Sequence, residues 1–389
     1  MLTNFYGDMG GGEFALLAHA NHLLATGFHV DVCLFRSGAL ADALTAAGCR
    51  VEVLRQRLDC GPRGALLVGM RLIPRLLRRF RAVGPRFVIA YTHHEMPFVV
   101  CAAQLAGVPA VFRDQGRPAQ STEEADWQRK RLARLTRRGQ MMVLPTTKTQ
   151  AEFLSRLGVP GERIRQVYLG VDRTPGDATC LPSAPARQAL GIPPRVPLLG
   201  VFGRLIALKG HAVLFHALRQ LRNSDAHLMI VGGTQLNAAR GTAYLESLKC
   251  LAGELDIVHR LHFTGFRSNV QELMSACDVI CSASEWETFG LSLVEAMMCG
   301  KPVVATDVSG PREIVVPGET GYLYPVGDAE ALAKHLDHLL ANPDLARRMG
   351  AAGRRRALIH FDQEKNLAEL DRVVNEMADA HLARRLVRS

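Results

Sequence analysis

Residues 284–320 read SEWETFGLSLVEAMMCGKPVVATDVSGPREIVVPGET, and this stretch carries the clearest evidence for the architecture of the chain. An apolar run, Val279–Ser282, comes just before it. Gly290 then opens an amphipathic segment that extends to about Met298, and Val303–Thr306 is a second apolar run. Short apolar runs separated by an amphipathic segment are typical of a strand-helix-strand unit in a parallel sheet.

The same alternation extends through the rest of the chain. In the first half the predicted strands are Val30–Phe35, Val51–Leu54, Phe87–Tyr91, Ala110–Phe112, Met142–Pro145 and Ile164–Tyr168. In the second half they are Leu198–Phe202, Leu228–Val231, Leu261–Thr264, Val279–Ser282 and Val303–Thr306. This pattern predicts an α/β protein with two Rossmann-like, doubly wound domains in tandem.

A segment rich in proline and small residues, Arg173–Pro197, predicts a linker that contains one short helical turn. The expected domains are therefore residues 1–172 and 198–361, facing each other across a cleft. Ligands of such sheets bind beyond the carboxyl ends of the strands, so the cleft is the expected active site. Residues 362–389 are predicted to form a helix that packs on a domain surface through Leu367, Leu370, Val373, Val374 and Met377.

The charge of the chain is unevenly distributed. Of 389 residues, 47 are Lys or Arg and 37 are Asp or Glu. Residues 1–172 hold 23 basic and 14 acidic residues, a net charge of +9, whereas the remainder holds 24 and 23. This asymmetry indicates that the first half meets an anionic partner.

The cysteines and the apolar stretches indicate the cellular compartment of the protein. Nine scattered cysteines without paired spacing favour reduced thiols in the cytoplasm over a zinc site or a disulfide framework. Cys277 and Cys281 are expected to be small buried residues rather than nucleophiles. No signal peptide is apparent, and the longest apolar stretch, Phe98–Phe112, falls short of the ~20 residues that span a bilayer.

Two glutamates in the quoted stretch are candidate ligands for hydroxyl groups. Glu287 follows the predicted strand Val279–Ser282, and Glu295 lies about two helical turns further on. Carboxylates accept hydrogen bonds from pairs of sugar or ribose hydroxyls, and free amides at a helix start near Gly290 bind oxygens. The alternative is that both are ordinary solvated acids at a helix end.

A second motif, GRLIALKG, follows the strand Leu198–Phe202. Arg204 and Lys209 flank the start of a predicted helix there, beyond the turn at Gly203. Two cations at a strand-to-helix junction can bind a diphosphate, because guanidinium engages two phosphate oxygens at once. Solvated surface charge is the alternative for this pair.

Together these motifs resemble those of the retaining GT-B glycosyltransferases of family 4, which have an E-x7-E signature and a G-R-L-x-x-x-K-G motif. The resemblance implies that Glu287 contacts the donor sugar and Glu295 the ribose. It implies that Arg204 and Lys209 hold the donor diphosphate and stabilise the leaving group. Further donor-binding residues implied are Gly203, Phe289, Gly290, Leu291 and, near the base, the backbone of Phe266.

The loop Gly7–Glu13 contains consecutive glycines before an apolar-periodic helix. Such a loop lets backbone amides approach a ligand, and Gly11 and Gly12 resemble the glycine loop that meets the donor diphosphate in this family. A NAD-binding loop is the rival interpretation, but the G-x-G-x-x-G spacing is absent. Only Met1–Phe5 precede the loop, so either residues are missing before Met1 or the central strand is unusually short.

Acceptor-side residues are expected after two strands of the first domain. His93 and His94 follow Phe87–Tyr91, while Asp114 and Gln115 follow Ala110–Phe112. The family commonly has a histidine where this chain has Gln115, which leaves Asp114 or His94 as substitutes. For each histidine, structural and catalytic roles both stay open.

The basic excess lies in two helical stretches, Leu66–Arg86 and Trp127–Arg138. Basic amphipathic helices are typical of contact with an anionic membrane surface, and solvated arginine is the alternative. Nucleic acid is not an expected partner, because neither stretch interleaves stacking aromatics with the charges.

The resemblance therefore implies a metal-independent, cofactor-free hexosyltransferase that moves a sugar from a nucleotide diphosphate sugar to a carbohydrate or lipid-linked acceptor with retention. The departing β-phosphate can take the acceptor proton, so no covalent nucleophile is needed. Assembly of cell-envelope polysaccharide, lipopolysaccharide or glycolipid is the expected pathway, in the cytoplasm or on the inner face of the cell membrane. The rivals are a nucleotide-sugar 2-epimerase of the same fold, a non-catalytic binding protein and, least favoured, a dehydrogenase.

Overall fold

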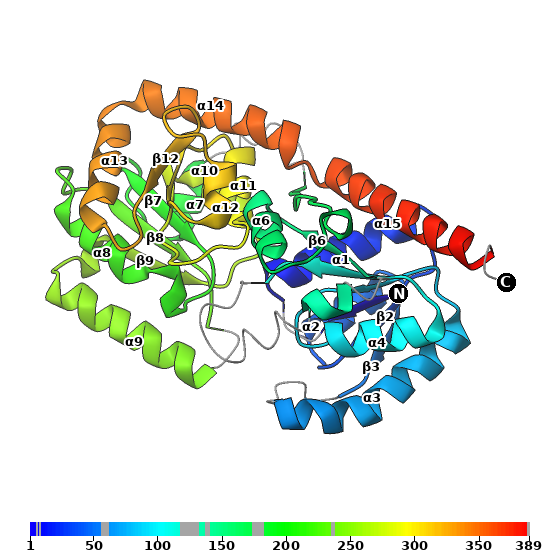
Figure 1. Ribbon diagram of the computed structural model, residues 1–389. Helices are drawn as coiled ribbons and strands as arrows, with labels where there is room; N and C mark the ends of the chain where they lie inside the picture. Colours follow the sequence, from blue (N-terminus) through cyan, green and yellow to red (C-terminus); the bar gives the residue numbers. More distant parts are fainter. Residues whose placement is uncertain are drawn as a thin grey trace. The chain divides into compact units, whose positions relative to one another are not determined.

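The computed structural model describes residues 1–4, 7, 9–55, 62–116, 132–136, 141–172, 183–234 and 238–386. The chain forms two compact units. Unit 1 comprises Met1–Leu169 and Glu364–Ser389, and unit 2 comprises Gly170–Gln363. Each unit contains one six-stranded sheet with helices (Figure 1), which confirms the predicted α/β architecture.

The sheet of unit 1 is entirely parallel, in the order β3-β2-β1-β4-β5-β6. Its strands are β1 (Leu2–Asn4), β2 (Asp31–Leu34), β3 (Arg50–Val53), β4 (Val88–Ala90), β5 (Ala110–Asp114) and β6 (Met141–Pro145). Its helices include α1 (Gly11–Ala25), α2 (Ala39–Ala46), α3 (Pro62–Val83), α4 (Met96–Ala106), α6 (Lys148–Arg156) and α15 (Gln363–Leu386).

Strand β1 has three residues and lies at the centre of this sheet. It pairs with β2 on one side and with β4 on the other, with Thr3 opposite both Cys33 and Ala90. In the chain as given, the central strand of this sheet is therefore short.

Side chains that alternate along the strands fill two separate cores. Val32 and Leu34 face the layer that contains α1, α2 and α15, while Cys33 and Phe35 face the layer that contains α3 and α4. Figure 1 shows α3 and α4 together on one face of the sheet. Both faces are covered, as expected for a parallel sheet.

Helix α15 belongs to unit 1 rather than standing as a separate C-terminal element. Five apolar residues of this helix pack against the core layer of α1, namely Leu367, Leu370, Val373, Val374 and Met377. These are the residues that the helical spacing selected. The first unit therefore begins and ends with distant parts of the sequence.

Unit 2 repeats the topology of unit 1. Its parallel sheet has the order β12-β11-β10-β7-β8-β9. Its strands are β7 (Leu198–Phe202), β8 (His227–Val231), β9 (Leu261–Gly265), β10 (Val279–Ser282), β11 (Val303–Thr306) and β12 (Gly321–Tyr324). Its helices are α7 (Ser183–Ala189), α8 (His211–Gln220), α9 (Ala238–Glu254), α10 (Val270–Ala276), α11 (Leu291–Met298), α12 (Ser309–Ile314), α13 (Ala329–Ala341) and α14 (Pro343–His360).

Two strand predictions differ from the structure. The segment Ile164–Tyr168 forms only an isolated bridge, Val143 to Ile164, although the amides of Arg165 and Val167 donate to the carbonyls of Val143 and Pro145. Pro145 has no N–H with which to return a hydrogen bond, so the ladder does not continue. The carbonyls of Val167 and Tyr168 accept instead from the buried guanidinium of Arg113. Strand β12, which begins at Gly321, was not predicted. The glycine is needed because a Cβ there would lie 2.0 Å from the carbonyl oxygen of Val303.

The predicted linker is only partly separate from the domains. Residues 173–182 lie outside the described residues, but α7 and the segment up to Pro197 are part of unit 2. The buried Arg187 donates to the carbonyls of Ala276 at 3.0 Å and Val196 at 2.7 Å, and it pairs with Asp278 at 3.1 Å. These bonds tie the second half of the linker to the sheet.

A buried polar chain anchors α15 to unit 1. The carboxylate of Asp371 can only accept, so His19 Nε2 carries the proton and donates to it at 2.9 Å. The other ring nitrogen, Nδ1, then accepts a hydrogen bond from the hydroxyl of Tyr91, at the end of β4. These two hydrogen bonds connect the sheet, through His19 of α1, to the C-terminal helix α15.

We predict that Asp371→Ala destabilises unit 1 by about 1–3 kcal/mol, because the buried N–H of His19 loses its acceptor. The matched control on the same helix is Asp379→Ala, which removes an exposed pair with Arg86 and costs less than about 1 kcal/mol. Hydrogen exchange of the α15 amides across a urea titration measures the loss of stability in both variants. Equal losses in the two variants would contradict the role of the buried chain.

Candidate functional site

The two sheets reverse their strand order at equivalent places, and the candidate residues gather there. In unit 2 the neighbouring strands β7 and β10 lie at the centre of the sheet. The chain continues from β7 to β8 on one side and from β10 to β11 on the other. Loops at such a reversal diverge and leave room for a ligand beyond the carboxyl ends of the strands. The loops in question are residues 203–210 after β7 and 283–290 after β10.

These two loops are held in close contact. The amide of Glu285 donates to the carbonyl of Leu208 at 2.9 Å. Gly210 has φ +64°, and a Cβ there would lie 2.0 Å from the carbonyl oxygen of Ala283. A larger residue would therefore push the two loops apart, so the glycine that ends GRLIALKG keeps the loops together.

An ion pair joins the two predicted motifs. Lys209 Nζ is paired with a carboxylate oxygen of Glu287, and both side chains are largely buried. Arg204 is exposed and makes no ion pair with any described residue. The site thus presents one compensated cation and one uncompensated cation, an arrangement that suits a ligand with more than one negative charge.

Helix α11 begins directly after Glu287. Gly290, with φ +108°, is its N-cap, and Leu291 is its first residue. Amides in a first helical turn lack intrahelical acceptors and can bind oxygens of a ligand. The side chain of Phe289 is buried and packs on Phe361 with ring centroids 5.7 Å apart, so the donor contact predicted for this residue remains a prediction for its backbone. Only the backbone of Phe289 is left to meet a ligand.

Glu295 lies on α11 and is half-buried. Desolvation by burial raises the pKa of its carboxyl to about 7. The group therefore titrates near neutral pH, where it changes between a hydrogen-bond donor and a pure acceptor.

Three further predictions concern the neighbours of this site. Gly203 follows β7, and its amide donates to the carbonyl of Val231 at 2.9 Å. Phe266 follows β9 and is 55% exposed, so it is accessible to a ligand. Cys277 and Cys281 are buried, and desolvation raises the pKa of both thiols, which agrees with their prediction as unreactive core residues.

The order reversal of unit 1 lies between β1 and β4. After β1, Gly10 is the N-cap of α1 and Gly11 and Gly12 are its first residues. A Cβ on Gly12 would lie 2.9 Å from Oε1 of Gln115, so the glycines and Gln115 are neighbours. Asp8, which belongs to the predicted glycine loop, lies outside the described residues.

The acceptor-side candidates lie in the turn after β4 and at the end of β5. His93 Nε2 lies 3.1 Å from Oδ1 of the buried Asp114. His94 is in the same turn and is half-buried. Of the predicted acceptor residues, the structure therefore joins His93 to Asp114 and brings Gln115 to the glycine loop.

Glu95 was not among the predicted site residues, although it holds the turn that carries His93. It is fully buried, and its carboxylate accepts hydrogen bonds from the amides of Tyr91 at 3.1 Å and Thr92 at 2.7 Å, and from the Thr92 hydroxyl. These bonds fix the turn that carries His93. The signal in the sequence was Thr92-x-x-Glu95, the spacing of a capping box.

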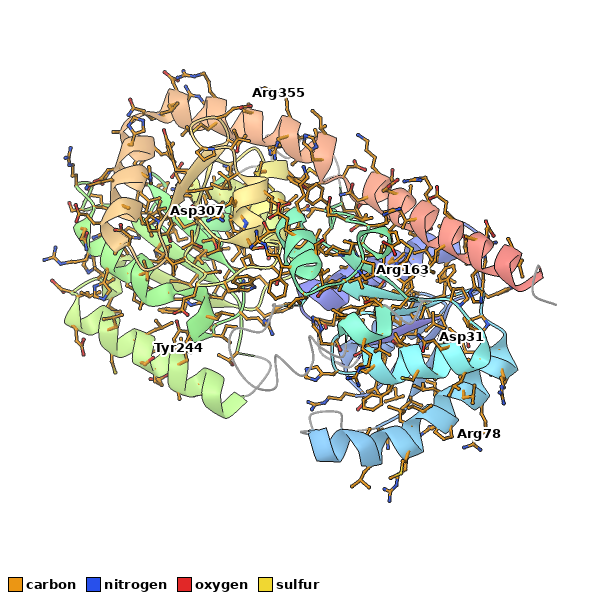
Figure 2. The ribbon with its side chains drawn as sticks, viewed as in Figure 1. Asp31, Arg78, Arg163, Tyr244, Asp307 and Arg355 are labelled. Carbon is orange, nitrogen blue, oxygen red and sulfur yellow. The ribbon has the colours of Figure 1, made fainter. Side chains whose placement is uncertain are left out.

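The basic helix α3 has one buried and one exposed face. Its buried side chains include Leu72, Leu76 and Phe80. The exposed face carries Leu67 and Met70, which are 62% and 59% exposed, together with Arg71, Arg78 and Arg81. Figure 2 shows the labelled Arg78 extending from α3 away from the sheet.

Half of the arginines in this stretch are used within unit 1. Arg75 pairs with Glu52, Arg79 with Asp31, and Arg86 with Asp379, at 3.2, 2.7 and 2.8 Å. Arg71, Arg78 and Arg81 make no ion pair with a described residue. In the second basic stretch, Trp127–Arg138, residues 127–131 and 137–138 lie outside the described residues.

Two features are absent from the described part of the chain. No described helix is both long and apolar enough to cross a membrane. No three His, Cys, Asp or Glu side chains among the described residues are grouped so that they could hold a metal ion.

Two family models match the chain, roughly one on each unit. The model described as Glycosyltransferase Family 4 matches residues 9–174. The model described as Glycosyl transferases group 1 matches residues 183–356.

Curated relatives match over part of their length. The chain is 36% identical over 149 residues to N-acetyl-alpha-D-glucosaminyl L-malate synthase of Bacillus anthracis, which covers 38% of this chain and 37% of that protein. It is 32% identical over 246 residues to D-inositol 3-phosphate glycosyltransferase of Mycobacterium sp. (strain JLS), covering 61% of this chain and 54% of that protein. The matches therefore span about a third to a half of these relatives.

Solved structures match over nearly the whole chain. The Anabaena protein HepE in complex with UDP-glucose has a TM-score of 0.82 at 24% identity, covering 96% of this chain and 99% of that one. A glycosyltransferase from Rickettsia africae has a TM-score of 0.84 at 19% identity, covering 97% and 98%. At these identities the likeness shows the fold, which is the GT-B arrangement of two α/β domains.

We predict that Glu295→Gln changes the pH dependence of stability. The pKa of the Glu295 carboxyl is raised in the folded chain, so the folded state favours the protonated form of this group. The contribution of Glu295 to stability is therefore complete below pH 4.5, the ordinary pKa of the group, and is lost as the pH rises through about 7. The neutral glutamine avoids this loss, so the variant is more stable than the parent at pH 8, by no more than about 3 kcal/mol. Thermal melting at pH 5 and pH 8 checks this, with the exposed Glu272→Gln as control; a variant that shows the parent's pH dependence would contradict it.

Proposed function

The chain belongs to the GT-B glycosyltransferases of family 4, and we propose that it transfers a sugar from a nucleotide diphosphate sugar to an acceptor hydroxyl with retention at the anomeric carbon. The proposed acceptor is a carbohydrate or a lipid-linked carbohydrate. The proposed pathway is assembly of envelope polysaccharide, lipopolysaccharide or glycolipid.

One observation carries this proposal: Arg204 and the Lys209–Glu287 pair lie together at the order reversal of unit 2. When a diphosphate binds, Lys209 exchanges its carboxylate partner for phosphate oxygens. Glu287 is then free to accept hydrogen bonds from sugar hydroxyls. The two motifs are therefore coupled, because the partner that Lys209 releases is the group that holds the sugar.

The proposed chemistry is stabilisation of the leaving group. As the bond between the anomeric carbon and the diphosphate breaks, negative charge develops on the β-phosphate. Arg204, Lys209 and the amides at the start of α11, at Gly290 and Leu291, are positive groups available for that charge. In the proposed reaction they do the work that a divalent cation does in metal-dependent transferases, so no metal is required.

Glu295, Gly203 and Phe266 are proposed to complete the donor site on unit 2, with Glu295 accepting from ribose hydroxyls. Gly11 and Gly12 of unit 1 are proposed to approach the diphosphate through their amides. The uridine nucleotides bound to HepE support a nucleotide sugar as the donor class.

A thermal-shift screen of UDP-, GDP- and ADP-sugars tests the donor class, because a ligand that binds only the folded state raises its melting temperature. Incubation of the protein with the best-binding donor and no acceptor distinguishes a glycosyltransferase from a nucleotide-sugar 2-epimerase. A 2-epimerase releases epimerised product under these conditions, whereas the proposed transferase does not. Absence of a shift with all three classes would contradict the proposal.

We predict that Lys209→Ala and Glu287→Ala have opposite effects on nucleotide binding. Lys209→Ala removes a phosphate ligand and leaves the Glu287 charge near the diphosphate, so UDP affinity falls about tenfold, or ~1.4 kcal/mol. Glu287→Ala frees Lys209, so UDP binds at least as tightly. Sugar transfer falls about 10²–10³-fold in both.

Calorimetric titration with UDP and a transfer assay measure these effects. Glu285→Ala is the matched control, because its side chain is exposed and only its amide bonds to the neighbouring loop. Full transfer activity in either Lys209→Ala or Glu287→Ala would overturn the assignment.

We further propose that unit 1 contacts an anionic membrane surface through the exposed face of α3, on the cytoplasmic side. Leu67 and Met70 supply apolar contact, and Arg71, Arg78 and Arg81 supply charge on the same face that no described residue neutralises. Apolar residues beside cations are the combination that binds a helix in a lipid interface.

We predict that replacing Arg71, Arg78 and Arg81 by alanine weakens binding to phosphatidylserine vesicles roughly a hundredfold at low salt, at about 1 kcal/mol for each arginine. The control replaces the exposed Arg195, Arg348 and Arg355 of unit 2, which changes the net charge equally. Vesicle co-sedimentation measures the binding. An equal loss in the control would show that net charge, rather than α3, is responsible.

A further inference from the structure

Helix α8 begins directly after the GRLIALKG motif, and a tyrosine of another helix contacts its first residue. That residue, His211, is buried and comes two positions after Lys209. Nδ1 of His211 lies 3.3 Å from the hydroxyl oxygen of Tyr244, and the two rings meet edge to face with centroids 5.8 Å apart. Tyr244 is half-buried and lies in the first half of α9 (Figure 2). A contact between two helices therefore follows closely after the lysine of the motif.

The hydroxyl of Tyr244 supplies the cap that α8 otherwise lacks. The N-cap residue, Gly210, has no side chain that could accept from the first amides of the helix. The backbone amide of His211 donates instead to the Tyr244 hydroxyl, and this hydrogen bond opposes the rise that burial causes in the pKa of Tyr244. Because the oxygen accepts from the amide, the hydroxyl proton is available to Nδ1. One hydroxyl thus bonds to both a backbone donor and a ring acceptor of the same residue.

The ring of His211 accepts this hydrogen bond because it is neutral. Burial lowers the pKa of His211 to about 4, and the nearby charge of Lys209 acts in the same direction. A neutral ring with an unprotonated Nδ1 carries its proton on Nε2. The contact therefore keeps one protonation state around neutral pH.

The two helices hold their side of this contact firmly. Leu248 and Ala252 of α9 are buried in the same core as Leu214 and Leu218 of α8. Tyr244 lies one turn before Leu248, on the same face of α9, and packs against this core. The hydroxyl is therefore presented to α8 by a side chain that has little freedom to move.

The end of the loop 203–210 is thereby fixed from two directions. On one side, the amide of Glu285 donates to the carbonyl of Leu208 at 2.9 Å. On the other side, Tyr244 holds His211. Lys209 lies between these two attachments along the chain. Its backbone is therefore held in place, while its long side chain can exchange one partner for another.

We propose that Tyr244 is a positioning residue for the donor diphosphate, which acts by fixing, through His211, the backbone that carries Lys209. The inference rests on the proposed function and adds to it a residue that neither sequence motif contains. A group that is in place before its ligand arrives loses less conformational freedom on binding. Tyr244 itself contacts neither donor nor acceptor in this proposal.

A double-mutant cycle tests whether Tyr244 acts through Lys209. Tyr244→Phe, Lys209→Ala and the combined variant are titrated by calorimetry in the full chain, with UDP, GDP and ADP as probes. Tyr244→Phe keeps the ring and removes only the hydroxyl, so we expect the tightest-binding nucleotide to bind about fivefold more weakly. In the Lys209→Ala background the same substitution changes affinity by less than about twofold, because the group that it positions is absent.

Two outcomes of the cycle would overturn the inference. One is a Tyr244→Phe variant that binds nucleotide as tightly as the parent. The other is a loss of affinity that is equally large with and without Lys209, which would show a general structural role. Tyr322→Phe is the matched control, because Tyr322 is a half-buried tyrosine of the same unit that stacks on His335, on the edge strand β12. We expect this control to leave affinity unchanged in both backgrounds.

Substitutions at position 211 separate the hydrogen bond from packing. His211→Asn retains an acceptor for the Tyr244 hydroxyl, whereas His211→Leu does not. We expect His211→Leu to match the loss in Tyr244→Phe, and His211→Asn to stay within about twofold of the parent. Equal losses in the two variants would contradict the hydrogen bond.

A spectroscopic measurement checks the hydrogen bond without any nucleotide. The ¹⁵N chemical shifts of the His211 ring at pH 7 report which nitrogen carries the proton. We expect the proton on Nε2, with Nδ1 unprotonated in the parent. A protonated Nδ1 would overturn the assigned direction of the hydrogen bond and with it the inference.

Failure of this inference is distinguishable from failure of the proposed function. If Lys209→Ala weakens nucleotide binding and Tyr244→Phe does not, the diphosphate site stands and the inference alone fails. If Lys209→Ala leaves the binding of all three nucleotides unchanged, the proposed role of Lys209 fails and the inference fails with it.

Discussion

The structure depends on one topological constraint, the reversal of strand order at the centre of each parallel sheet. In unit 1 the reversal lies between β1 and β4, and in unit 2 between β7 and β10. Crossovers on the two sides of a reversal leave in opposite directions, so the carboxyl ends of the two central strands are left uncovered by the crossovers. Apart from Phe266, which follows the edge strand β9, every candidate residue discussed for donor or acceptor lies in or near the loops at these two positions or at the end of a neighbouring strand.

Glycines make these loops close enough to act together. A Cβ at Gly210 would meet Ala283, and one at Gly232 would lie 1.8 Å from the carbonyl oxygen of Gly203. Backbones that approach so closely bring charged side chains from separate strands into contact, as Lys209 and Glu287 are. The same principle operates in unit 1, where Gly116 makes room for the ring of His93 and Gly12 makes room for Gln115.

Much of the fold could be predicted from the sequence, because apolar runs such as Leu198–Phe202 are buried on both faces of a parallel sheet and stand out against polar loops. Strand β12 could not, since its Gly321 is explained only by the approach of β11. The candidate residues of the donor motifs were predicted by spacing. Their pairing was not, because Lys209 and Glu287 are 78 positions apart and their contact depends on the tertiary fold. Likewise, the burial of Phe289 depends on Phe361, which local sequence does not reveal.

Helix α15 returns the chain to unit 1 after all of unit 2 has been made. During synthesis, unit 2 is a continuous segment and can fold as soon as its last strand and helices leave the ribosome. Unit 1, although translated first, lacks Asp371 and the apolar face of α15 until the end, so His19 has no carboxylate partner and part of the core layer over α1 is uncovered. The order of synthesis and the order of completion are therefore opposite: the unit translated first is the last to be finished.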